Sequence, residues 1–192
     1  MIKLKDMKDN KVLVVIDCQN DFIDGSLANE EAQKKVPNIV KKINEFDGSC
    51  IFVTQDTHGE NYLKTTEGEH LPVEHCIRGT KGWEINEDVK KALDEAEKRN
   101  ISVYYIEKPT FGSYELTNRI YLELEKYGSC EVEFVGFCTD ICVVSNALLL
   151  KAALFETGKI KVDASCCAGV TPESHNAALL TMKMCHIEVE GE

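Results

Sequence analysis

The sequence predicts an α/β protein: a single domain, residues 1–192, with a doubly wound, mostly parallel six-stranded sheet and helices on both faces, a Rossmann-like three-layer sandwich. Two observations predict this class. Apolar β-branched runs alternate with helical patterns along the chain, which is the order of strand-helix-strand units with right-handed crossovers. The first run, Lys11-Val-Leu-Val-Val-Ile16, is apolar on both faces, as expected of a central strand in a parallel sheet.

The individual elements follow from periodicity and from the residues that interrupt it. Strands are predicted where apolar and β-branched residues run together, at 11–16, 49–54, 102–106, 131–135, 160–163 and 185–189. Helices are predicted where apolar residues recur every three or four positions, at 29–46, 84–100, 113–127, 141–157 and 172–184. Polar or glycine-containing stretches predict loops at 17–25, 59–82 and 164–170. The longest of these is expected to be functional, because long loops are uncommon inside compact domains.

Three of the predicted helices have distinctive features. Pro37 lies inside the first and predicts a bend. The last begins with Pro172 at its first position, after a Thr171 cap. The helix at 141–157 is apolar over too wide an arc for an ordinary surface helix. It is therefore expected to pack on the sheet and to be covered by another subunit, so a homo-oligomer is predicted.

Composition and charge restrict the class of partner. A net charge of −11 and a pI near 5.0 argue against nucleic acid and anionic membrane, so a small-molecule substrate is expected. No segment has the ~20 apolar residues of a membrane span, and residues 1–10 lack a signal-peptide core, which predicts a cytoplasmic protein. The nine cysteines, including Cys166-Cys167, are then expected to be thiols. The chain contains no Gly-x-Gly-x-x-Gly or Gly-Lys-Ser/Thr phosphate motif, which argues against nucleotide binding.

One cysteine stands where a nucleophile could be activated. Val135-Gly136-Phe137-Cys138-Thr139-Asp140-Ile141-Cys142 predicts a strand, a sharp turn and a helix start. Thr139 or Asp140 is expected to cap that helix and to place Cys142 in its first turn, where the helix dipole favours an anion. The thiol should then ionise more easily than a free one, beside amides suited to an oxyanion. A buried structural thiol is the alternative.

Two charged residues are expected at the same edge of the sheet as this cysteine. Asp17 ends a buried strand, and Lys108 closely follows another. Carboxyl ends of parallel strands meet at one edge, where open α/β sheets bind their ligands. A turn or cap aspartate and a solvated loop lysine are the alternatives for these two positions.

A metal site is also possible at this edge. Asp56 and His58 follow a strand and can point the same way, and His75 lies in the long polar loop. Glu67 or water could supply a fourth ligand. A mixed oxygen and nitrogen set with open positions suits Zn, Mn or Fe better than a closed structural site. Solvated loop histidines are the alternative interpretation.

Five motifs, in this order along residues 11 to 170, together resemble the isochorismatase-like cysteine hydrolases, and most closely the nicotinamidase branch. They are Asp-Cys-Gln-Asn-Asp-Phe from Asp17, Thr-Gln-Asp-Thr-His ending at His58, Pro-Val-Glu-His-Cys ending at Cys76, Glu-Lys-Pro-Thr-Phe-Gly-Ser around Lys108, and Gly-Phe-Cys-Thr-Asp-Ile-Cys-Val around Cys142.

The resemblance implies a catalytic triad and a metal centre. The triad would be Asp17, Lys108 and Cys142, and the metal ligands Asp56, His58, His75 and, as in some members, Glu67. Zinc is the first expectation for the metal, which in nicotinamidases takes the pyridine nitrogen. The resemblance further implies a cis peptide between Phe137 and Cys138, and an oxyanion hole from the amides of Cys138 and Cys142.

The implied activity is hydrolysis of nicotinamide to nicotinate and ammonia through a thioester, a step of NAD salvage and pyridine nucleotide biosynthesis. The chain departs from the family pattern at Leu71, where many nicotinamidases have tryptophan, and in the two residues between Pro72 and His75, where one is commoner. Phe22, Leu71 and Tyr105, or Tyr114, are therefore expected as substrate walls.

Two alternatives remain open. A related enzyme could act on another small amide or on an isochorismatase-type ether, although isochorismatases need neither the Asp/His/His set nor a cysteine. A non-catalytic member could instead serve as a binding or thiol-redox module, through Cys166-Cys167 or Cys138 with Cys142.

Overall fold

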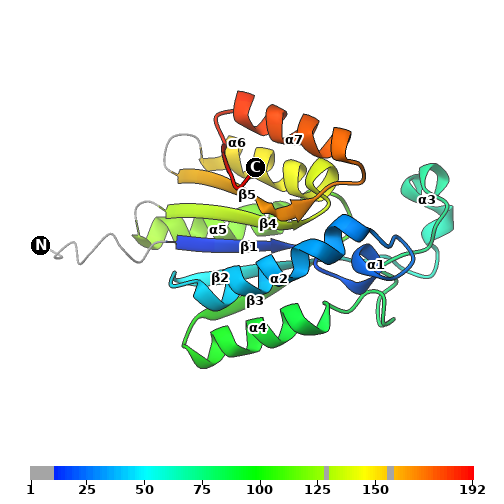
Figure 1. Ribbon diagram of the computed structural model, residues 1–192, viewed down its shortest axis with the longest axis horizontal. Coiled ribbons are helices and arrows are strands. Elements are labelled where there is room, and N and C mark those ends of the chain that lie inside the picture. The colour runs from blue at the N-terminus through cyan, green and yellow to red at the C-terminus, as the bar shows by residue number, and fades with distance from the viewer. Residues whose placement is uncertain (1–10, 128–129, 155–157) are drawn as a thin grey trace, which may run out of the picture.

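The computed structural model describes residues 11–127, 130–154 and 158–192. Its six strands form one sheet in the order β3-β2-β1-β4-β5-β6, and every neighbouring pair is parallel (Figure 1). The strands are β1 (Lys11–Ile16), β2 (Cys50–Asp56), β3 (Ser102–Lys108), β4 (Cys130–Phe137), β5 (Gly158–Ala168) and β6 (Glu188–Glu190). The predicted doubly wound parallel sheet is confirmed.

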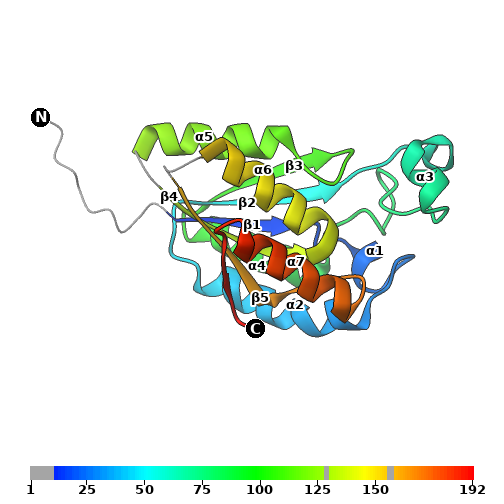
Figure 2. The ribbon, with the colours of Figure 1, turned by 90° about the horizontal axis from the view of Figure 1, so that it is seen from above.

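Helices cover both faces of the sheet. They are α1 (Asn20–Ile23), α2 (Glu30–Glu45), α3 (Thr66–His70), α4 (Glu87–Lys98), α5 (Tyr114–Tyr127), α6 (Val144–Leu154) and α7 (Pro172–Met184). Apolar residues of α2 and α4 form one core against the sheet, and those of α5, α6 and α7 form the other (Figures 1 and 2). Among the described residues, no helix is long and apolar enough to cross a membrane.

The structure corrects several element boundaries. The segment predicted as a loop at 59–82 contains a 3₁₀ turn, η1 (Tyr62–Lys64), and α3, which stands beyond the carboxyl ends of the strands (Figure 2). The loop predicted at 164–170 is wrong for its first part, because β5 extends to Ala168, with a shift of register where it passes β4. The predicted end of the 141–157 helix lies outside the described residues.

The strand order determines where the polar residues that follow the strands lie. Crossovers from β1 and β4 lead in opposite directions, so their carboxyl ends border the switch point of the sheet, where ligands bind in such folds. Ile16 of β1 pairs with Gly136 of β4, immediately before Asp17 and the turn to Cys142. Gly136 has φ +119°, and a Cβ there would lie 2.1 Å from the Ile16 carbonyl oxygen. Only glycine at this position therefore allows strands β1 and β4 to approach each other this closely.

Candidate active site and metal centre

Three buried side chains from separate elements meet at the carboxyl edge of the sheet. Asp17 and Cys142 are 0% and 5% exposed, and Lys108 between them is 1% exposed. The Lys108 Nζ lies 2.6 Å from Asp17 Oδ2 and 3.4 Å from Cys142 Sγ. The structure thus brings together the three residues for which the family resemblance implies a catalytic triad.

Asp17 is held in a specific orientation. Its φ of +45° is a left-handed conformation that is unusual for aspartate. The Thr54 hydroxyl donates to Asp17 Oδ1 at 2.6 Å, while Oδ2 faces Lys108. Burial raises the pKa of Asp17, against the opposing effect of the Lys108 charge. The carboxylate is therefore suited to taking up and releasing a proton. The sequence analysis did not identify Thr54.

The local environment of Cys142 differs from the sequence-based prediction. Cys142 lies in η2 (Thr139–Val143), a π turn whose N-cap is Cys138 and has no side-chain cap. The prediction that Thr139 or Asp140 caps the helix is therefore wrong, because both side chains bond elsewhere. The prediction of an easily ionised thiol is also wrong: burial raises the pKa of Cys142, and the lowering effect of Lys108 does not compensate.

Four possible metal ligands gather beside this triad. Asp56 ends β2, Glu67 lies in α3, and His58 and His75 come from the loops that flank α3. Asp56 Oδ2 lies 2.9 Å from His58 Nε2 and 3.5 Å from His75 Nε2. Glu67 Oε1 lies 3.6 Å and 3.7 Å from the same two nitrogens. One ligand atom from each of the four residues lies within 4.8 Å of the other three.

The donor set fits a divalent metal. His58 Nε2 is buried and makes no hydrogen bond, although it lies 2.9 Å from Asp56 Oδ2. His75 Nδ1 lies 2.9 Å from the Val73 carbonyl oxygen, which leaves Nε2 directed toward the other ligands, as in metal-bound histidines. Burial and the Asp56 charge raise the pKa of Glu67. A cation bound at this point would reduce the repulsion between the two carboxylates.

Aromatic rings enclose the two histidines. The buried ring of Tyr62 lies 4.7 Å from the His58 ring and 4.9 Å from the His75 ring, measured between centroids, and its hydroxyl donates to the Leu71 carbonyl at 2.9 Å. Phe22 contacts His75 edge-on at 5.7 Å. Sequence analysis placed Phe22 and Leu71 near the substrate but missed Tyr62, an aromatic residue in an otherwise polar segment.

The loop after β1 positions the metal-site backbone. Gln19 exchanges two hydrogen bonds with Asp56: its Nε2 donates to the Asp56 carbonyl at 2.8 Å, and its Oε1 accepts from the Asp56 amide at 2.7 Å. Asp21 accepts from the Cys76 amide at 2.7 Å, next to His75. Neither role was identified from the sequence. Both residues lie in the first of the five motifs, so their spacing after Asp17 was the available signal.

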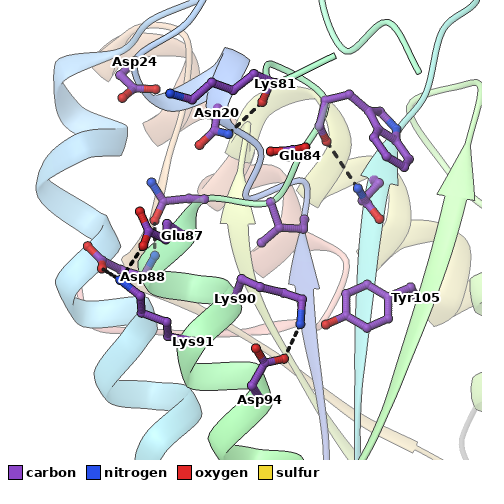
Figure 3. Close-up of a pocket in the computed structure, with 14 residues that line it drawn as sticks. Asn20, Asp24, Lys81, Glu84, Glu87, Asp88, Lys90, Lys91, Asp94 and Tyr105 are labelled. Atoms are coloured by element: carbon purple, nitrogen blue, oxygen red, sulfur yellow. Dashed lines mark hydrogen bonds and ion pairs between the residues drawn. The ribbon is translucent and has the colours of Figure 1, made fainter. Parts of the chain in front are cut away.

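Tyr105 does not lie beside the triad. It lines a surface cleft of about 910 Å³ between β3 and α4, where Lys90 Nζ lies 5.9 Å from its ring centroid (Figure 3). Side chains of a strand alternate between faces, and Tyr105 is three residues from Lys108, so the two point to opposite faces. The expectation that Tyr105 forms a substrate wall is therefore wrong. The alternative, Tyr114, is 78% exposed at the start of α5.

The positions of Cys166 and Cys167 argue against a disulfide between them, which one form of the thiol-redox alternative would require. Cys166 and Cys167 are adjacent in β5 and pack into the cores on opposite faces of the sheet, which separates their thiols. Cys138 is half-buried next to Phe137, and the bond between them is cis, as the resemblance implied.

The chain is similar to known proteins of one family. A family model described as the isochorismatase domain matches residues 11–190, which include the triad and the four possible ligands. An uncharacterized isochorismatase family protein, PncA of Bacillus subtilis, is 31% identical over 143 residues, covering 72% of this chain and 76% of that protein.

Two solved structures are similar over almost their whole length. The nicotinamidase/pyrazinamidase PncA from Bacillus subtilis has a TM-score of 0.77 and 28% identity, covering 94% of this chain and 99% of that chain. The pyrazinamidase of Pyrococcus horikoshii in complex with zinc has a TM-score of 0.70 and 26% identity, covering 94% and 98%.

Proposed function

This chain belongs to the isochorismatase family, and on that premise we propose that it is an amidohydrolase that converts nicotinamide to nicotinate and ammonia. The observation that carries the proposal is the position of Lys108. Its Nζ lies 2.6 Å from Asp17, 3.4 Å from Cys142 Sγ and 3.5 Å from Asp56 Oδ1, so it joins the triad to the metal set. A substrate with both an amide and a ring nitrogen suits such an arrangement.

The triad residues supply the acylation chemistry. Asp17 accepts the proton of the Cys142 thiol as sulfur attacks the amide carbon, and Lys108 holds both groups in place. Because burial raises the pKa of the Cys142 thiol, proton transfer to Asp17 would accompany the attack. The backbone amides of Cys138 and Cys142 stabilise the oxyanion. The carbon–nitrogen bond then breaks, and the leaving nitrogen takes the proton from Asp17 and departs as ammonia.

The same carboxylate serves in hydrolysis of the thioester. Asp17 accepts a proton from water as the water oxygen attacks the acyl carbon, and the carbon–sulfur bond breaks to release nicotinate. Asp17 then gives that proton to the Cys142 sulfur, which returns both groups to their starting states. This alternation requires a carboxylate whose protonated form is accessible, and burial of Asp17 supports that requirement.

Asp56, His58, Glu67 and His75 would hold the divalent metal, with zinc the first candidate and Mn or Fe the alternatives. When bound, the metal supplies a Lewis acid that attracts the substrate ring nitrogen. Phe22 and Leu71 would flank the ring, with Leu71 in place of the tryptophan common in nicotinamidases. The zinc complex of the Pyrococcus horikoshii pyrazinamidase supports this choice of metal.

A substrate panel tests the activity. Ammonia release should be fastest with nicotinamide or pyrazinamide and at least about tenfold slower in kcat/KM with amides that lack a ring nitrogen, such as benzamide, because those lose one of the two points of attachment. Bound metal is assayed in the same preparation. Equal rates for benzamide and nicotinamide would contradict the proposal and favour a different small amide.

We further propose that the protein is a cytoplasmic homo-oligomer that acts in NAD salvage. The partly buried Val144 and Leu148 on α6, with the exposed Leu122 on α5 and Leu180 on α7, support a covered surface on this side of the sheet. Sedimentation velocity at micromolar concentration should show a species larger than the 21.5 kDa monomer. A monomer alone would refute the oligomer.

A further inference from the structure

Hydrogen bonds join the π turn that carries Cys142 to the first turn of α7, which lies more than 30 residues later in the sequence. The Asp140 carboxylate accepts from Ser174 of α7 and from Val170 just before that helix: the Ser174 hydroxyl donates to Oδ2, and the Val170 amide donates to Oδ2 at 3.0 Å and to Oδ1 at 3.2 Å. On the neighbouring residue, Thr139 Oγ1 lies 2.8 Å from His175 Nδ1. Four residues, Thr139 and Asp140 in the turn and Ser174 and His175 in α7, thus form what we call the α7 latch.

The turn has backbone hydrogen bonds of its own, because the Cys138 carbonyl accepts from the Ile141 and Val143 amides. The contacts with α7 and the loop before it add the side-chain bonds that hold Thr139 and Asp140. The N-cap of the turn, Cys138, contributes no side-chain hydrogen bond. Thr139 is fully buried, so water does not compete for its contact with His175. Burial, followed by the nearby Lys35 charge, lowers the pKa of His175, which favours the neutral ring.

The α7 side of the latch is itself well anchored. Ser174 accepts from the Thr171 amide at 3.1 Å, and Thr171 Oγ1 accepts from the Ser174 amide at 3.1 Å, so the predicted Thr171 cap is present as a capping box. The preceding loop is held by Asn29, whose Nδ2 donates to the Gly169 carbonyl at 2.8 Å. A Cβ at Gly169 would lie 2.8 Å from His175 Cβ, so the loop packs closely against the latch.

We propose that Asp140, Ser174 and His175 are positioning residues that fix the Cys142 thiol relative to Lys108 and to the substrate carbonyl. None of the three side chains is proposed to touch the reacting atoms. They act through the backbone of the turn. A displacement of about 1 Å at a reacting atom can reduce a rate about 100-fold while binding is largely retained. The kinetic part of this inference rests on the proposed function.

Two variants separate positioning from helix capping. Ser174→Ala removes the hydroxyl that donates to Asp140 and also weakens the capping box. Thr171→Ala weakens the same capping box but retains the Ser174 hydroxyl and the Asp140 carboxylate, which makes it the matched control. We expect Ser174→Ala to lower kcat about 10- to 100-fold with KM within about twofold, and Thr171→Ala to retain kcat within about twofold. Ser174→Thr keeps the hydroxyl, so its kcat should remain close to that of the wild type.

A second readout does not depend on the substrate. Hydrogen exchange of the amides in 139–143, followed by mass spectrometry, should be faster in Ser174→Ala and unchanged in Thr171→Ala. Asp140→Asn, which keeps the side-chain shape but weakens acceptance of the Ser174 and Val170 hydrogens, should accelerate exchange as well.

The outcomes distinguish the latch from the activity. An unchanged kcat in Ser174→Ala, or an equal loss in Thr171→Ala, would overturn the inference. If the wild-type protein releases no ammonia from nicotinamide, the proposed function fails and the exchange experiment alone decides. Unchanged exchange in Ser174→Ala refutes the latch, and faster exchange in Ser174→Ala but not in Thr171→Ala supports it.

Discussion

Replacing Cys142 by alanine is expected to lower kcat for nicotinamide by at least about four orders of magnitude, because removal of a covalent nucleophile eliminates the acyl-enzyme route. Cys142 is only 5% exposed and contributes one sulfur to the core, so the fold should persist with a stability loss of about 1 kcal/mol. Ammonia release measures the activity, and circular dichroism with thermal unfolding measures the fold.

Cys138 provides the matched control for this substitution. It lies four residues away in the same turn and is proposed to contribute only its backbone amide, which alanine retains. Cys138→Ala should therefore keep kcat within a few-fold of the wild type. Asp17→Asn should show a loss comparable to that of Cys142→Ala, because an amide cannot accept the thiol proton. Substantial turnover in a folded Cys142→Ala protein would remove this residue from the mechanism.

Removal of the metal should produce the second largest effect. Dialysis against a chelator, with metal loss verified by elemental analysis, is expected to lower kcat/KM for nicotinamide at least about 100-fold, and added zinc should restore it. His75→Ala should lower metal affinity about 10- to 100-fold or more, because it removes one of four possible ligands whose donor atoms lie within 4.8 Å of one another.

The control lies in the same segment. His70 is exposed at the end of α3, and its Nδ1 lies 2.8 Å from the Thr66 carbonyl oxygen, away from the ligand set. His70→Ala should leave metal content and activity unchanged. Full activity after verified metal loss would exclude Asp56, His58, Glu67 and His75 from the reaction.

Much of the fold could be predicted because strong local signals agreed with the final packing. Val12 to Ile16 are apolar at every position, and in the structure they contact helices on both faces. The site residues could be predicted for a related reason: in a parallel sheet, residues that follow different strands lie at the same edge. Asp17, Asp56 and Lys108 follow or end β1, β2 and β3, so their convergence required no knowledge of side-chain contacts.

The errors arose where tertiary contacts decide the local structure. Asp140 looks like a helix cap in sequence, but its carboxylate accepts from Ser174 of α7, 34 residues later. Cys142 occupies the position of an activated thiol, yet its burial outweighs the favourable charge of Lys108. The short helix α3 has no apolar periodicity to reveal it. Tyr105 was a different kind of error, since its odd separation from Lys108 already indicated opposite faces.

The position of Asp56 has a consequence for substitution at that site. Its Oδ1 faces the Lys108 ammonium at 3.5 Å, while its Oδ2 faces both histidines. Asparagine has the same shape, but its NH₂ group must replace one of these oxygens. In one orientation the NH₂ group would face the Lys108 ammonium, which requires an acceptor, and in the other it would replace the oxygen proposed to bind the metal. Two neighbouring demands thus make the carboxylate irreplaceable even by its nearest isostere.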